Sequence, residues 1–204
     1  APPEPLQPIT LPLPVTLPWS IGELVLAGES PLTFSRLKGL YRYRTADRAW
    51  NLGVDDAHQF DLDSVEVAGG RYQAKAVLGA QAPMPLRVDA SGEVRTTVPG
   101  GEAVTLQAIA KVSGILATTD AALDASASVK ATGGVNPAEA PTLDAQARLR
   151  PWWPQPIETA DATMARIDLA AFWPQAPVTL LSGTVKAQPQ GEAWRAELRL
   201  ANAA

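Results

Sequence analysis

The chain has 204 residues and a mass of 21.5 kDa, which fits one domain or one elongated module. Its net charge of −4 excludes a strongly basic nucleic-acid-binding protein. The absence of cysteine excludes disulfides, thiolate metal sites and a cysteine nucleophile, and a single histidine leaves no multi-histidine metal centre. We expect no membrane-spanning helix, since no run of about 18 apolar residues occurs, and no signal peptide.

Residues 1–18 are rich in proline, with seven prolines among the eighteen residues. Proline fixes φ and lacks the N–H that a helix needs, so this stretch predicts an extended arm. Leu11, Leu13, Val15 and Leu17 alternate with proline or threonine, and such an arm could lie along a sheet edge, where the missing N–H does no harm. We therefore divide the chain into an arm, residues 1–18, and a β-module, residues 19–204.

From Trp19 onward, apolar and polar residues alternate with a period of two. The stretch from Tyr72 to Leu78 is typical, because its even positions are apolar and its odd positions are polar. This pattern predicts strands with one apolar and one hydrated face rather than amphipathic helices. Glycine pairs at residues 69–70, 100–101 and 133–134, and Asn136-Pro137, mark turns between the strands. The sequence thus predicts an antiparallel meander of roughly ten to thirteen strands of ordinary length.

Helix is expected at one place only, a single turn that begins after Asp168 as N-cap and stops before Pro174. Because no helix layer can cover the apolar faces, the sheet must form a sandwich, a barrel or a curl. The inward residues are mostly alanine, valine and leucine, which favours a curled sheet around an apolar groove. We thus predict an all-β, elongated, curled antiparallel sheet (a β-taco) with almost no helix. The residues expected to line its groove are Tyr72, Leu78, Leu86, Val88, Val104, Leu106, Leu123, Val129, Leu143, Leu149, Leu198 and Leu200.

Several segments resemble TamB-type proteins, the inner-membrane half of the translocation and assembly module, and their AsmA-like and bridge-like lipid-transport relatives. They are WSIGELVL (19–26), GRYQAKAVLG (70–79), PMPL (83–86), IDLA (167–170) and PVTLLSG (177–183). The resemblance extends over most of the chain from Trp19 to Leu200, and it concerns the general character of these segments rather than one specific motif.

The resemblance implies a periplasmic part of an inner-membrane-anchored protein, with a long curled sheet and a hydrophobic interior. It implies a role in outer-membrane protein assembly, in phospholipid transport between the membranes, or in both. The implied partners are phospholipid acyl chains or unfolded outer-membrane protein segments and, through the full-length protein, an Omp85-type outer-membrane barrel. The chain would then be an internal fragment, without the family's membrane helix and C-terminal domain.

No catalytic or metal-binding motif emerges, so we expect a non-enzymatic protein without cofactor or metal. His58 stands among aspartates, but their spacing does not match a calcium loop, and we interpret it as part of a polar loop and strand edge. The serines lack the flanking pattern of a nucleophile elbow.

The pair Trp152-Trp153, flanked by Pro151 and Pro154, is the most unusual local feature. It is interpreted either as a loop over the groove end or sheet edge, or as a lip that contacts lipid. A sugar-binding platform is a third reading. The alternative functions are accordingly a carbohydrate-binding domain and an adhesin-like structural β-domain, although uneven spacing of the glycine pairs counts against a solenoid.

Overall fold

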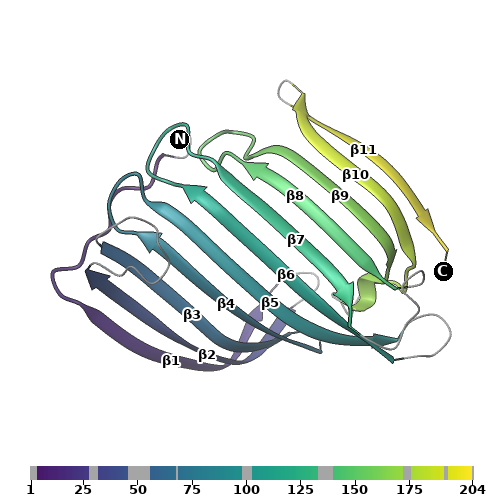
Figure 1. Cartoon of the computed structure of the whole chain (residues 1–204), viewed down its shortest axis with the longest axis horizontal. Helices are drawn as coiled ribbons and strands as arrows, with labels where there is room; N and C mark the ends of the chain where they lie inside the picture. Colours follow the sequence, from purple (N-terminus) through teal and green to yellow (C-terminus); the bar gives the residue numbers. More distant parts are fainter. Residues whose placement is uncertain are drawn as a thin grey trace.

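The computed structural model describes residues 4–27, 32–45, 56–67, 69–97, 103–132, 140–171, 176–190 and 193–203. These residues form eleven strands and one short 3₁₀ turn, η1, at Leu169–Ala171 (Figure 1). The strands are β1 (Val15–Leu26), β2 (Leu32–Thr45), β3 (Asp56–Val67), β4 (Gly70–Gly79), β5 (Pro85–Thr97), β6 (Ala103–Ile115), β7 (Leu123–Ala131), β8 (Thr142–Leu149), β9 (Ile157–Ile167), β10 (Leu181–Gln190) and β11 (Ala193–Asn202). The predicted all-β fold is confirmed.

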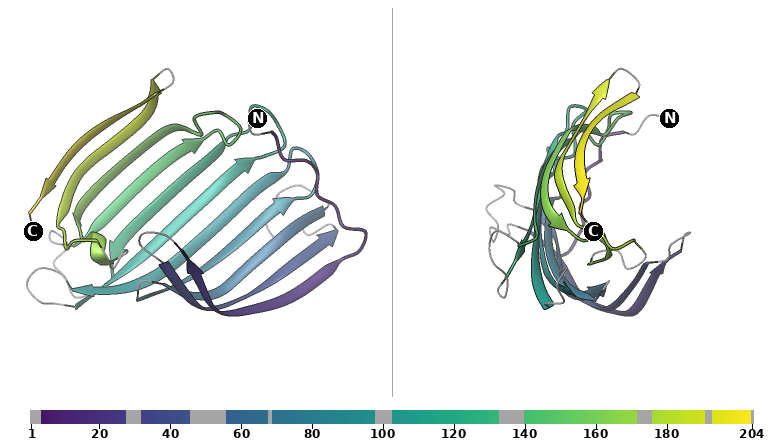
Figure 2. Two further views of the ribbon diagram at one scale, coloured as in Figure 1. Left: turned by 180° about the vertical axis from the view of Figure 1, so that it is seen from behind. Right: turned by 90° about the vertical axis from the view of Figure 1, so that its right-hand side faces the viewer.

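All eleven strands belong to one antiparallel sheet in which their spatial order equals their order in the sequence. The sheet does not close on itself, so β1 and β11 are its two edges. It curls into a trough with a C-shaped profile, in which β1 and β2 form one arm of the C and β10 and β11 the other (Figure 2). The predicted curled meander is thus confirmed as well.

The two faces of the sheet differ in chemistry because residues opposite each other on neighbouring strands share a face. The concave face carries apolar pairs, such as Leu78 opposite Leu86. The outer face carries charges of alternating sign that follow one row across four strands, Asp61, Lys75, Asp89 and Lys111. Opposite charges in this arrangement favour one register, and a slip by one residue would bring the charges to the concave face.

The boundary of the N-terminal arm differs from the expected one. β1 begins at Val15, four residues before Trp19, and continues through Pro18. Proline is tolerated in an edge strand where its nitrogen faces solvent, which explains why the strand includes Pro18. Residues 4–14 have no regular secondary structure and do not extend an edge strand. Instead, their backbone N–H groups bond to loops at the strand ends, Leu6 to Leu116 O and Ile9 to Ala80 O.

The connections agree with the sequence where the structure describes them. The pair Gly69-Gly70 joins β3 to β4, and Gly69 has a φ of 74°, a conformation that favours glycine. The other predicted turns, 100–101, 133–134 and 136–137, lie outside the described residues. The predicted helical turn is present as η1, and the carboxylate of Asp168 accepts a hydrogen bond from the Ala170 N–H at 3.0 Å, as expected of a cap.

The main buried cluster lies on the concave face between β5 and β8. It consists of Val94, Val104, Leu106 and Val129, with the partly buried Ala108, Ala131 and Leu143 packed against it. All four central residues lie close to the strand ends that border the turns after β3, β5 and β7. The 3₁₀ turn η1, which follows β9 at the same border, contacts β5. The cluster therefore forms a core at one border of the trough rather than along its middle.

Two aromatic rings on the concave face depend on a glycine in the neighbouring strand. The Tyr72 ring lies over Gly92, and the Trp19 ring lies over Gly39, its directly opposed residue. A Cβ at Gly92 would collide with the Tyr72 ring and approach the Arg71 carbonyl oxygen to 2.7 Å. A missing side chain on one strand thus makes room for a large one on the next.

We predict that Gly92→Ala lowers the free energy of unfolding by about 1–3 kcal/mol, because the added methyl displaces the Tyr72 ring. Gly22→Ala in β1 is the matched control, since a Cβ there meets no atom within 4 Å. Urea denaturation of both variants measures the difference. Equal stability of the two variants would show that the ring does not depend on Gly92.

A second prediction concerns the buried cluster. Leu106 is 1% exposed and Leu17 is 56% exposed, although both lie on the concave face. Leu106→Ala should lower the free energy of unfolding by about 2–5 kcal/mol, whereas Leu17→Ala should change it by about 0.5 kcal/mol or less. The midpoints and slopes of urea unfolding curves test both values, and a small loss at Leu106 would contradict a packed core at this border.

Candidate functional site: an alanine-floored trough

The middle of the concave face consists of two adjacent rows of small residues that cross the strands from β4 to β11. The strand registers place the members of each row directly opposite one another. The first row is Ala74, Ala90, Ala110, Ala127, Ala145, Ala162, Val185 and Leu198. The second row is Ala76, Val88, Val112, Ala125, Ala147, Ala160, Ala187 and Ala196. We call these two rows the alanine floor.

Larger side chains flank the alanine floor on both sides. Toward the turns after β3, β5 and β7, the next row carries Tyr72, Val129, Leu143, Met164 and Leu200, with the small residues Gly92, Ala108 and Gly183 between them, and the Tyr72 ring lies over Gly92. Toward the opposite strand ends, the flanking row consists of Leu78, Leu86, Gly114, Leu123 and Leu149. Small residues between two bulkier rows make a channel that runs across the strands, along the long direction of the sheet. Over eight strands spaced about 4.8 Å apart, this channel is roughly 34 Å long.

The floor is open. Every one of its residues is half-buried or exposed, whereas Val129 and Leu123 in the flanking rows are buried. A groove of about 310 Å³ lies on the part of the floor between β6 and β10, and its apolar lining is Ala110, Val112, Ala125, Ala127, Ala145, Ala147, Ala160, Ala162 and Val185. Lys111, Ser126, Gln146 and Asp161 also border the groove, but the strand registers place them in one row on the outer face. The alanine and valine side chains on the concave face offer no hydrogen-bonding group, so the groove suits an apolar and slender occupant.

One border of the trough, which we call the arm rim, is covered by the N-terminal arm (Figure 2). His58 on β3 anchors the arm, because its Nε2–H donates to the Ile9 carbonyl oxygen at 2.7 Å. Its Nδ1 then accepts from the Tyr41 hydroxyl at 2.8 Å, and the Tyr43 ring packs 4.9 Å away between centroids. His58 is 4% exposed. The interpretation as a polar loop and strand edge was wrong, since His58 lies on the concave face of an inner strand.

The predicted tryptophan lip belongs to the loop of residues 150–156 on the same rim. Trp152 donates its indole N–H to the Leu116 carbonyl oxygen at 2.8 Å. Trp153 is 46% exposed, and the Arg150 guanidinium lies 5.0 Å from its ring centroid. Arg150 also pairs with Glu158 at 2.7 Å, and this hydrogen bond lowers the pKa of the Glu158 carboxyl. One tryptophan is therefore fixed to a neighbouring loop, and the other presents an apolar surface at the rim.

At the opposite border, the turn rim, the described residues after Ile167 form η1, which contacts β5, and lead into β10. Asp168 ties this segment together, because its carboxylate accepts hydrogen bonds from the N–H groups of Ala170 and Thr179, each at 3.0 Å. The Thr179 hydroxyl donates to the Ile167 carbonyl oxygen at 3.2 Å, and Thr179 is buried. Chain outside the strands is thus tied down at both long borders of the trough, and among the described residues β1 and β11 are the first and last strands of the sheet.

All twelve residues predicted to line the groove lie on the concave face, but they occupy three different environments. Those buried in the rims are Val104, Leu106, Leu123 and Val129. Those half-buried along the trough are Tyr72, Leu78, Leu86, Val88, Leu143 and Leu149. Leu198 and Leu200 on β11 are exposed, by 59% and 41%. The predicted set therefore describes the flanks of the trough and its end more than its floor.

The alanines of the floor were missing from the predicted set because sequence reasoning selected the largest inward residues. The signal was present: alternation already assigned Ala125, Ala127, Ala145 and Ala147 to the inward face of their strands. Alternation does not determine the register between neighbouring strands, and it is this register that places the alanines in unbroken rows.

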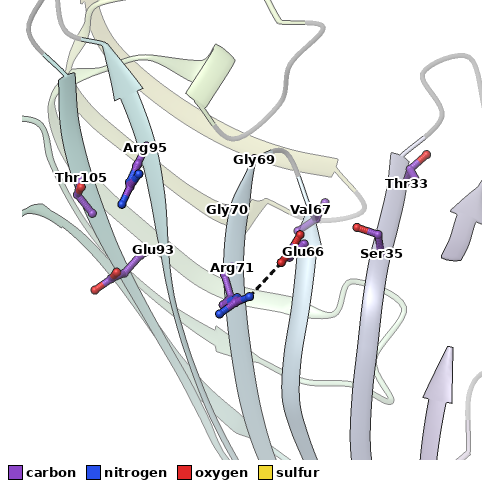
Figure 3. A pocket seen from close by; sticks show the side chains of 10 residues that line it. All are labelled: Thr33, Ser35, Glu66, Val67, Gly69, Gly70, Arg71, Glu93, Arg95 and Thr105. Atoms are coloured by element: carbon purple, nitrogen blue, oxygen red, sulfur yellow. Dashed lines mark hydrogen bonds and ion pairs between the residues drawn. The ribbon is translucent and has the colours of Figure 1, made fainter. Parts of the chain in front are cut away.

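The outer face has a polar hollow of about 580 Å³ near the turn at Gly69-Gly70 (Figure 3). Its charged lining residues include Arg71 and Glu66, which form an ion pair at 3.2 Å, and Arg36 also pairs with Glu66. Neighbouring Glu93 lies opposite Arg71 in the sheet register. These charges compensate one another, so the hollow has no excess of one sign that would select a ligand.

Among the described residues, no three histidine, cysteine, aspartate or glutamate side chains gather where they could hold a metal ion. A helix with the length and hydropathy to cross a membrane is likewise absent from the described part of the chain. No family model matches the chain, and comparison with curated proteins and with solved structures finds no match. Any functional assignment therefore depends on the geometry of the trough and on the residues that line it.

Proposed function

We propose that the chain is a non-enzymatic hydrophobic conduit whose trough holds acyl chains of phospholipids or apolar segments of unfolded outer-membrane proteins. The open alanine floor is the observation that carries this proposal. A half-exposed apolar row loses part of the free energy that burial provides, about 25 cal/mol per Å². An apolar occupant that covers the floor recovers it.

The dimensions of the floor support a chain-like occupant. The channel of roughly 34 Å is about twice the thickness of one leaflet's hydrocarbon layer, which is roughly 15 Å. Its narrow cross-section, between rows of larger side chains, fits an extended chain better than a compact ring.

The wider setting follows from the TamB-type resemblance and belongs to the same proposal. The chain would be a periplasmic part of an inner-membrane-anchored protein that assists outer-membrane protein assembly or phospholipid transport. Contact with an Omp85-type outer-membrane barrel would occur through the full-length protein.

The competing proposal is a carbohydrate-binding domain that uses Trp152 and Trp153. Exposed Trp153 favours it, since sugars stack on aromatic rings. Two contacts count against it: the Trp152 N–H is already bonded to Leu116, and Arg150 lies over the Trp153 ring. An adhesin-like structural domain gains no support from a specific contact.

Two adjacent residues of β7 give a sharp test of the conduit. Ala127 is on the floor, and Ser126 points to the outer face of the same strand, opposite Lys111. Ala127→Asp should weaken binding of a fluorescent fatty acid by roughly tenfold or more, because a carboxylate would lose water beside the acyl chain. Ser126→Asp should leave binding unchanged, although it adds the same charge.

Titration of the fluorescent fatty acid measures both affinities, and circular dichroism with urea denaturation verifies that each variant is folded. If folded Ala127→Asp binds as tightly as Ser126→Asp, the floor is not the binding site. Native mass spectrometry of the purified protein separates the competing functions. Co-purified phospholipid supports the conduit, whereas sugar binding that is lost in Trp153→Ala supports the carbohydrate-binding domain.

A further inference from the structure

The first row of the alanine floor meets large side chains at β3. Ala74 on β4 lies opposite Leu62 on β3, and Leu62 lies opposite Gly39 on β2. Gly39 has no side chain, but the Trp19 ring from β1 lies over it and fills that space. From β4 to β1, this row therefore changes from alanine to leucine and then to an indole ring.

The second row changes in the same way. Ala76 on β4 lies opposite Phe60, whose ring packs against the Tyr41 ring of β2 with 4.8 Å between centroids. The Tyr41 hydroxyl donates to His58 Nδ1 at 2.8 Å, and His58 donates to the Ile9 carbonyl oxygen, so the Tyr41 ring has a fixed position. Phe60 is 47% exposed although it contacts Tyr41, so its ring projects above the alanines beside it.

The large side chains of both rows lie across the channel where the alanine floor ends. We call Phe60 and Leu62, with Tyr41 and Trp19 behind them, the aromatic barrier. It lies where the sheet bends from the floor into the arm of the C that β1 and β2 form (Figure 2). Because β2 and β3 are inner strands, each paired on both sides, the barrier does not depend on what borders β1. The corner between the barrier and the floor is apolar on two sides.

We propose that the aromatic barrier ends the acyl-chain site and holds the methyl end of a bound chain. This inference rests on the proposed conduit function, and it gives the site an end and the bound chain a direction. A chain end in the corner is covered on two sides, whereas on the floor alone it is covered on one, so the corner buries more apolar surface. A carboxylate or a phosphate headgroup would lose water in the corner, and it therefore stays over the open part of the floor.

Photocrosslinking with two forms of palmitic acid tests this placement. One form carries a diazirine at the methyl end and the other carries it beside the carboxylate, and mass spectrometry of peptides identifies the labelled strands. An acyl chain of roughly 15 Å extends over about three strand spacings of about 4.8 Å. We therefore expect the methyl-end probe to label mainly β3 and β4, and the carboxylate-end probe to label mainly the strands near β7.

Two variants move the barrier, and a third leaves it in place. Ala76→Phe places a ring one strand further along the floor and should shift methyl-end labelling from β3 and β4 toward β5 and β6. The double variant Phe60→Ala/Leu62→Ala lowers the barrier and should extend methyl-end labelling to β2. Leu17→Ala is the control, because Leu17 is 56% exposed on the concave face, much like Phe60, but lies behind Tyr41. It should leave the labelling pattern unchanged.

Circular dichroism and urea denaturation verify that each variant is folded. Equal labelling patterns for the two probes would overturn the barrier while leaving acyl-chain binding intact, as would a methyl-end pattern that neither Ala76→Phe nor the double variant shifts. If palmitic acid does not displace the fluorescent fatty acid and labels no strand, the conduit function itself is refuted, and this inference with it.

Discussion

A single sheet with one apolar face must hide that face without a second layer, and this constraint shapes the whole molecule. Curling brings the two ends of the sheet toward each other, but it does not fill the space between them. The chain solves the problem in part at the borders, where the arm bonds to loops at one rim and Asp168 holds the segment after β9 at the other. Along the middle of the concave face, the side chains are small instead, and each alanine exposes little apolar surface to water.

The same constraint explains the division of roles between residues that look alike in the sequence. Leu106 and Leu198 both alternate with polar neighbours, yet one is buried in a rim and the other is exposed at the end strand. Their environments differ because Leu106 packs in the cluster with Val94, Val104 and Val129, whereas Leu198 lies on the last strand of the sheet. Alternation identifies the face of a residue, whereas burial depends on what lies above that face.

The fold was predictable because its information is local. Period-two alternation, paired glycines and the absence of helical periodicity together specify an antiparallel meander. Asp168, as a candidate N-cap, predicted the helical turn η1. The site was predictable only in part, because register is set by turn lengths and by irregularities such as the shift between Leu62 and Val65. The contact of His58 with Ile9 joins residues 49 positions apart, and no local pattern reports it.

The order of the strands has a mechanical consequence. Among the described elements, each strand contacts only the strands before and after it in the sequence, apart from the contact of η1 with β5. Such an assembly resembles a one-dimensional array, whose stability is a sum of nearest-neighbour terms. Unfolding can then begin at an end and proceed strand by strand. A pair of strands can also be added or removed in the middle, which changes the length of the channel while its cross-section stays constant.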